Sequence, residues 1–178
     1  TSLFQQNLDD EINGFVFDPA TFLGTAENRD GESVRRGVEL QAQWRLNEQI
    51  GVSASYTYTD STEPDAFGED IRELRRPPHA GNVSADFRSG DGRFQAMIAA
   101  DYGGSRRDVF FPPFPASATT VALSDFWLVD MTLQYEVTQS VSLFARGTNL
   151  LDDNYEQVFG YQTLGRAGYL GVRLNFGQ

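Results

Sequence analysis

The chain has 178 residues, enough for one domain, and its net charge of −11 argues against nucleic acid as a partner, because phosphates repel an acidic surface. Hydrophobic residues make up 40% of the sequence, yet no apolar run reaches the length of a membrane-spanning helix. Cysteine is absent, which suits an envelope protein but is also common among cytosolic domains.

Alternation of apolar and polar residues predicts eight β-strands, because a period of two gives a strand one apolar and one polar face. The first, over residues 2–12, is the least regular, since Asp9, Asp10 and Glu11 interrupt it. The second, VELQAQWRL over residues 38–46, alternates throughout. The others are expected at residues 52–59, 82–88, 94–102, 127–136, 141–148 and 168–176, with Phe144 as an aromatic exception on a polar face.

The expected connections between these strands alternate between very short and very long. Short turns are expected near residues 47–49, 89–92 and 138–139, and the second of them, SGDG, has strong turn chemistry. The long connections cover residues 13–30, 60–78, 105–124 and 151–165. This sorting is typical of outer-membrane β-barrels, whose short side is periplasmic. A soluble β-sandwich, the alternative, has no reason to sort its connections in this way.

Aromatic residues on the apolar faces form two groups, one at each end of the strands. The group beside the short turns and the chain end comprises Trp44, Phe87, Phe94, Tyr135 and Phe176. The group beside the long connections comprises Tyr56, Tyr58, Tyr102 and Trp127. Two such belts are what the two membrane–water interfaces select. They favour an antiparallel transmembrane β-barrel over the core of a sandwich.

The predicted polar faces carry small and charged residues, among them Ser53, Asp86, Asp101 and Arg173. Eight strands can close into a barrel that side chains just fill, and a closed small barrel could pair these charges. A larger barrel could direct them at water or at an inserted plug domain. The residues leave both open, so a self-contained eight-stranded structural or adhesive barrel is an alternative to a part of a larger one.

Four segments of the chain resemble the C-terminal part of TonB-dependent outer-membrane receptors. They are Arg36-Gly37-Val38-Glu39-Leu40, VSASYTY at residues 52–58, Asn149-Leu150-Leu151-Asp152 with Asn154-Tyr155, and the terminal Leu174-Asn175-Phe176. The resemblance implies an all-β, antiparallel transmembrane barrel of about 22 strands, of which residues 1–178 form the last eight. It also implies a plug domain and a TonB-contacting segment that are not in this sequence.

The function implied by this resemblance is uptake across the bacterial outer membrane, with the chain as barrel wall and extracellular loops. Such receptors take up a scarce, bulky nutrient such as cobalamin or a ferric siderophore. The implied partners are a corrinoid or metal-chelate ligand, TonB, the receptor's own plug domain, and outer-membrane lipid with lipopolysaccharide. No nucleic acid and no cofactor are expected.

A narrower resemblance concerns the ligand. Residues 155–166, YEQVFGYQTLGR, look like the corresponding segment of the cobalamin receptors of this family, and Arg75-Arg76 falls where those receptors also have an arginine pair. By this resemblance, Arg75 and Tyr161 lie at positions that contact the corrinoid. The expected ligand-binding residues are Arg75, Arg76, Tyr161, Gln162 and Arg166.

The residues themselves allow two interpretations of the arginine pair, which precedes Pro77-Pro78. Its guanidinium groups suit a phosphate, carboxylate or amide on a ligand, or they neutralise the acidic connection before them. That connection matches no calcium-loop spacing and is expected to be a solvated loop; it contains Asp60, Glu63, Asp65, Glu69, Asp70 and Glu73. The cluster FFPPFP at residues 110–115 is expected to pack on neighbouring loops, ahead of a ligand or a plug.

His79 is the single histidine of the chain, so no metal site or Ser-His-Asp set can be assembled around it, and an enzyme is not expected. It is expected to cap the strand at 82–88. An outer-membrane hydrolase is the third hypothesis, with His79 as its candidate base. No signal peptide is visible at Thr1, so we expect the exported chain to begin upstream. Gly177-Gln178 follow Phe176, where related receptors end on the aromatic residue, and a short extension is one interpretation.

Overall fold

The computed structural model describes residues 1–28, 30–65 and 68–176, and every regular element in them is a β-strand. The strands are β1 (Ser2–Asp9), β2 (Ile12–Asp18), β3 (Leu23–Asn28), β4 (Glu32–Arg45), β5 (Ile50–Pro64), β6 (Asp70–Arg72), β7 (His79–Arg88), β8 (Phe94–Gly103), β9 (Arg106–Phe110), β10 (Thr119–Leu123), β11 (Phe126–Thr138), β12 (Val141–Thr148) and β13 (Ala167–Leu174). Gly177 and Gln178, on which the question of an extension depends, lie outside the described residues. Within the described ranges, no helix is long and apolar enough to cross a membrane.

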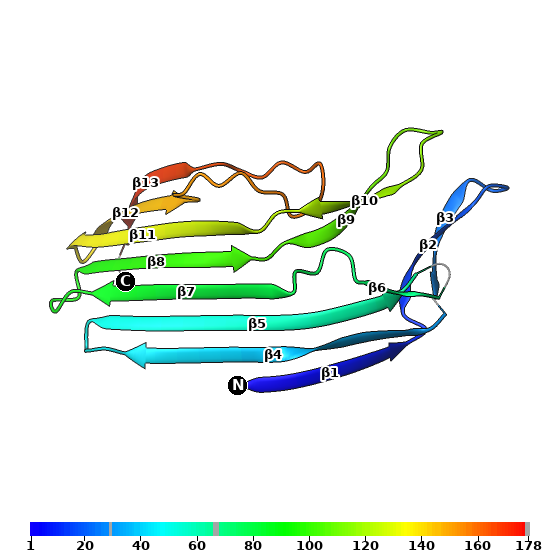
Figure 1. Cartoon of the computed structure of the whole chain (residues 1–178). Helices are drawn as coiled ribbons and strands as arrows, with labels where there is room; N and C mark the ends of the chain where they lie inside the picture. The colour runs from blue at the N-terminus through cyan, green and yellow to red at the C-terminus, as the bar shows by residue number, and fades with distance from the viewer. Residues whose placement is uncertain (29, 66–67, 177–178) are drawn as a thin grey trace.

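Eight strands form one antiparallel sheet in the order β1-β4-β5-β7-β8-β11-β12-β13, with the short β6 beside β5. Figure 1 shows the short turns at one end of this sheet and the long connections at the other. The edge strands β1 and β13 do not pair with each other in the described chain, so the sheet is open, as a part of a larger barrel would be. All eight predicted strands are confirmed, and the closed eight-stranded barrel is not what this sheet forms.

Strand pairing gathers the predicted apolar residues on one face of the sheet. Leu40 lies opposite Tyr56, and Ala54 lies opposite Val83, which in turn lies opposite Ala100. Because side chains of directly opposed residues point to the same face, this apolar surface runs without a break across neighbouring strands. Its side chains remain exposed in the isolated chain; examples are Leu40, Trp44, Val83, Ile98, Trp127, Leu170 and Val172.

The aromatic belts lie at the two ends of that apolar face. The rings of Phe87 and Phe94 are 6.1 Å apart near the short turns. The rings of Tyr102 and Trp127 are 4.9 Å apart where the long connections begin. The register therefore confirms that the predicted aromatic residues within the strands share one face at opposite strand ends. Phe176 follows the end of β13, so the register does not place it.

The opposite face of the sheet is polar and is cross-linked between neighbouring strands. Its side-chain pairs are Ser53 with Ser84 at 2.7 Å, Asn82 with Asp101 at 2.7 Å, Arg45 with Asp86 at 3.3 Å and Arg146 with Asp130 at 3.7 Å. Phe144 also lies on this face, opposite Gly171 on β13. A β-carbon on Gly171 would lie 2.3 Å from Cζ of Phe144, so the ring occupies the space that the glycine leaves. The aromatic exception in the alternation is thus compensated on the next strand.

The long connections contain secondary structure that the sequence did not predict. Strands β2 and β3 form one hairpin, β9 and β10 form another, and β6 adds to the end of β5 (Figure 1). Strands β4 and β5 also extend further toward this end than the predicted residues 38–46 and 52–59. The buried hydrophobic residues of the described chain, Leu123 and Phe126, lie here beneath the connections.

Candidate functional site: a pocket among the long connections

An open pocket of about 470 Å³ lies at the end of the sheet where the long connections gather. It is lined by Arg75, Gln157, Val158, Tyr161, Gln162 and Thr163. The fold therefore brings together three of the five residues predicted to bind a ligand, Arg75, Tyr161 and Gln162, from connections far apart in the sequence. The pocket combines a guanidinium group, a phenol, amides and a hydroxyl with the apolar side of Val158.

Arg75 is anchored at both its backbone and its side chain. Its backbone N–H donates to the carbonyl of Arg107 at 2.7 Å, and its Nε donates to Asp108 at 2.7 Å. Its φ of +59° is uncommon for a residue other than glycine, so the surrounding contacts hold the backbone in this conformation. The side chain is still 52% exposed, which leaves its guanidinium group accessible from the pocket.

Asp108 lies under the pocket with no exposed surface. One carboxylate oxygen accepts from Nε of Arg75 and from the N–H of Val109, at 2.7 and 2.8 Å, and the other accepts from the N–H of Phe159 at 2.7 Å. Burial acts to raise the pKa of Asp108, but the hydrogen bonds outweigh burial and hold that pKa below its ordinary value. Sequence reasoning missed Asp108. The one available signal was a single acid within the run RRDVFF.

Arg106, two residues earlier on the same face of β9, holds the last long connection as well. Its guanidinium group donates to the carbonyls of Glu156 and Gln157, the latter at 3.3 Å, and it lies 5.2 Å from the ring centre of Phe126. The ring of Phe126 in turn lies 4.5 Å from that of Tyr155. Strand β9 therefore fixes the connection that supplies most of the pocket lining.

Arg76 and Arg166, the other two predicted ligand-binding residues, line no part of this pocket. Arg76 forms an ion pair of 2.7 Å with Glu73, which also binds Arg35 at 2.9 Å. Burial acts to raise the pKa of Glu73, but hydrogen bonds from Arg35 and Arg76 bring that pKa below its ordinary value. Arg166 binds Asp152, with its backbone N–H at 2.9 Å and its guanidinium group at 3.6 Å. Arg76 thus neutralises the acidic connection, whereas its neighbour Arg75 reaches Asp108, outside that connection.

In the aromatic cluster at residues 110–115, one phenylalanine packs on a neighbouring connection and two are exposed. The ring of Phe110 lies 5.2 Å from that of Phe159, so this residue packs on the last long connection as expected. Phe111 and Phe114 are 75% and 97% exposed at the tip of the β9–β10 hairpin.

His79 is the first residue of β7, at the strand end that it was expected to cap. Its Nδ1 lies 2.7 Å from the hydroxyl of Tyr56, and its ring lies 5.2 Å from that of Tyr58. These contacts place the candidate base of a hydrolase in the aromatic belt of the apolar face, away from the pocket. In the ranges that the structure describes, no group of three His, Cys, Asp or Glu residues could hold a metal ion.

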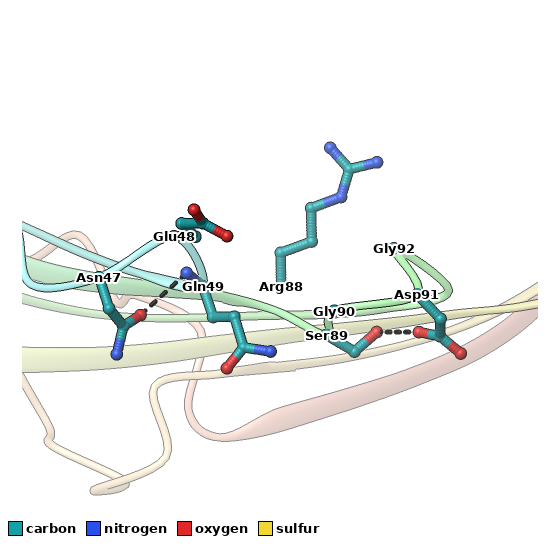
Figure 2. A pocket seen from close by; sticks show the side chains of 8 residues that line it. All are labelled: Asn47, Glu48, Gln49, Arg88, Ser89, Gly90, Asp91 and Gly92. Carbon is teal, nitrogen blue, oxygen red and sulfur yellow. Dashed lines mark hydrogen bonds between the residues drawn. The ribbon is translucent and has the colours of Figure 1, made fainter.

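A larger pocket, of about 660 Å³, lies at the opposite end of the sheet between the turns that join β4 to β5 and β7 to β8 (Figure 2). Its side-chain hydrogen bonds stay within each turn: Asn47 accepts from the N–H of Gln49 at 2.8 Å, and Ser89 donates to Asp91 at 2.5 Å. Between the two segments, the backbone N–H of Arg88 donates to the carbonyl of Gln49 at 2.8 Å and continues the pairing of β5 with β7. The guanidinium group of Arg88 lies beside the β7–β8 turn, since a β-carbon on Gly92 would be 3.2 Å from one of its terminal nitrogens. Because these groups close their own turns and no predicted site residue is among them, we regard the smaller pocket as the functional candidate.

Comparisons with known proteins agree with this architecture. The vitamin B12 transporter BtuB of Vibrio cholerae serotype O1 is 29% identical over 169 residues, which cover 94% of this chain and 26% of the transporter. Two solved structures share the fold: the ferripyoverdine receptor of the Pseudomonas aeruginosa outer membrane, and the closed form of the ferric-catecholate import receptor Fiu from Escherichia coli K12. Their identities are 16% and 20% and their TM-scores 0.73 and 0.71, and each match covers 98% of this chain and 24% of the receptor.

The chain thus spans about a quarter of the length of the relatives that it matches. A sequence profile described as "TonB dependent receptor-like, beta-barrel" matches residues 1–150, which is most of the chain. The open antiparallel sheet, its two-faced strands and its sorted connections are those of such a barrel wall. On this evidence, the chain belongs to the β-barrel family of the TonB-dependent receptors.

Proposed function

We propose that this chain forms the barrel wall and the extracellular loops of an outer-membrane transporter for a bulky nutrient, with a cobalamin-like corrinoid as the first candidate ligand. The single observation that carries the ligand site is the pocket in which Arg75 meets Tyr161 and Gln162. In the proposal, residues 1–178 act as one portion of a larger barrel. A plug domain and a TonB-contacting segment belong to the remainder of the receptor.

The dimensions of the sheet support the membrane part of the proposal. Phe94 and Tyr102 mark the two aromatic belts on β8, and the strand between them spans roughly 26 Å at the rise of a β-strand. At the tilt of barrel strands, about 40°, this length covers roughly 20 Å of height, close to the apolar band of about 25 Å in such barrels. The exposed apolar face therefore fits hydrocarbon, while the polar face lies toward the barrel interior.

The chemistry of the pocket supports a ligand that is large and rich in hydrogen-bond acceptors. Arg75 offers guanidinium donors, Tyr161 and Thr163 offer hydroxyls, and Gln162 offers an amide on an otherwise open surface. A corrinoid carries amides and a phosphate that such donors suit, and a relative 29% identical to this chain is named a vitamin B12 transporter. A ferric siderophore is the second candidate, because receptors for such chelates share the fold.

Binding to the full receptor that carries this segment tests the proposal. A hydrogen bond to a charged group contributes roughly 1.5–3 kcal/mol, so Arg75→Ala combined with Tyr161→Ala is expected to weaken cyanocobalamin binding at least about tenfold. Surface expression of the variant should stay at the wild-type level. The matched control is Arg36→Ala, which removes an exposed arginine that pairs with Asp60 at 2.9 Å. Unchanged affinity in the double variant would refute the corrinoid assignment, and binding of ferripyoverdine in its place would support the second candidate.

A further inference from the structure

Asp108 differs from every other acidic residue of the described chain in being fully buried while it accepts hydrogen bonds from three separate segments. The N–H of Val109 comes from β9 itself, Nε of Arg75 comes from the connection between β5 and β7, and the N–H of Phe159 comes from the connection between β12 and β13. Two of these segments supply the whole lining of the pocket. The pocket is therefore built on two connections that meet at one carboxylate.

The geometry also determines how Arg75 is presented. Its Nε donates a hydrogen bond to Asp108, and about half of the side chain stays exposed. A guanidinium group fixed through Nε keeps its two terminal nitrogens in a defined plane, because the group is rigid and flat. Less rotamer freedom then has to be lost when a ligand binds.

We propose that Asp108 is a positioning residue of the ligand pocket, which holds the two long connections together and orients the guanidinium group of Arg75 toward the ligand. It does so without touching the ligand, because it has no exposed surface. The part of this inference that concerns ligand binding rests on the proposed function. The part that concerns the two connections does not.

Asp108→Asn is the informative variant because it keeps the size of the side chain and removes only its charge and one acceptor. Whichever way the amide is oriented, its NH₂ group faces a donor, either Nε of Arg75 or the N–H of Phe159. The last long connection stays attached through Arg106, so the variant is expected to fold. Asp60→Asn is the matched control, since Asp60 also pairs with an arginine, Arg36, but outside the pocket.

The first measurement needs no ligand. Spin labels on cysteines at Arg72 and Leu164, both exposed, report the distance between the two connections in the full receptor with other cysteines removed. We expect a narrow distance distribution in the wild-type background and in Asp60→Asn, and a clearly broader one in Asp108→Asn. A distribution in Asp108→Asn as narrow as that of the wild-type background would overturn the proposal, whatever the ligand.

The second measurement is a double-mutant cycle on cyanocobalamin affinity with Asp108→Asn and Arg75→Ala. We expect Asp108→Asn to weaken binding about tenfold in the wild-type background, and by at least threefold less in the Arg75→Ala background, because its action runs partly through Arg75. Equal effects in both backgrounds, or a broadened distance distribution with unaltered affinity, would overturn the positioning role. If the wild-type receptor binds neither cyanocobalamin nor ferripyoverdine, the proposed function fails, and the spin-label distances alone then decide whether Asp108 joins the connections.

Discussion

At the scale of single residues, side chains that are unusual for their position are accommodated by groups that lie next to them in space. Phe144 is an aromatic residue on a polar face, and its ring is accommodated because Gly171, directly opposite on β13, has no side chain. Asp108 is a fully buried carboxylate, and hydrogen bonds from three donors compensate for its burial. Gly171, and two of the three donors to Asp108, lie on a different strand or connection, so neither compensation could be recognised from the residue's own segment.

The pairing of Phe144 with Gly171 predicts a specific rescue. Gly171→Ala would place a β-carbon against Cζ of Phe144, and overpacking of this kind costs about 1–3 kcal/mol. We expect a lower urea midpoint for unfolding of the detergent-solubilised receptor, and recovery when Phe144→Ala is added. Gly168→Ala on the same strand is the control, since nothing lies within 4 Å of a β-carbon there. A double variant no more stable than Gly171→Ala would contradict the pairing.

At the scale of elements, β9 holds the long connection between β12 and β13 in place at the end of the sheet. Arg106 and Asp108 point to the same side of this strand, because residues two apart share a face, and both contact the connection at residues 151–165. Arg107 between them points to the other side and is exposed. The β9–β10 hairpin is therefore a structural support for the pocket, although the sequence suggested only a long irregular connection.

This arrangement predicts different effects for two adjacent arginines. Arg106→Ala removes the donors to the carbonyls of Glu156 and Gln157 and should make residues 151–165 several-fold more sensitive to protease in the full receptor. Arg107→Ala should leave the cleavage rate near that of the wild type, because its contact with Arg75 runs through the backbone carbonyl. Equal cleavage rates in the two variants would show that β9 does not hold this connection.

At the scale of the whole molecule, the sheet has two faces that suit two different environments. Ile98 and Met97 are neighbours near the middle of β8, and their side chains are 46% and 50% exposed in the isolated chain. Ile98 lies opposite Met131 on the apolar face, whereas Met97 lies opposite Asp86 and Thr132 on the polar face. Ile98 and Met97 are both apolar and similarly exposed, so the two positions differ in the face of the sheet on which they lie.

Arginine at these two positions therefore tests which face meets lipid. Ile98→Arg places a charge near the middle of the bilayer, which costs about 2–4 kcal/mol in a membrane barrel. We expect it to reduce the yield of folded receptor in outer membranes and its unfolding midpoint. Met97→Arg should stay within about 1 kcal/mol of the wild type, because its charge can reach Asp86 across the strands. Equal losses at both positions would contradict the proposed orientation of the sheet.

The sequence by itself determined the strands, their two faces and the sorting of short and long connections. Each of these depends on neighbours within one segment: alternation decides the faces of β4 and β8, and turn residues such as Gly90 and Asp91 decide where a hairpin closes. The same local patterns placed Arg75, Tyr161 and Gln162 among the candidate residues, through resemblance to related receptors.

Only the tertiary structure decided how these residues meet. Arg75 and Arg76 are adjacent and identical in type, yet one lines the pocket and the other pairs with Glu73, because a backbone turn at Arg75 sends their side chains to different partners. Asp108 gained its role from donors 33 residues before it and 51 residues after it. Contacts of such separation leave no periodic trace in the sequence, since they are created when the sheet brings distant connections to one end.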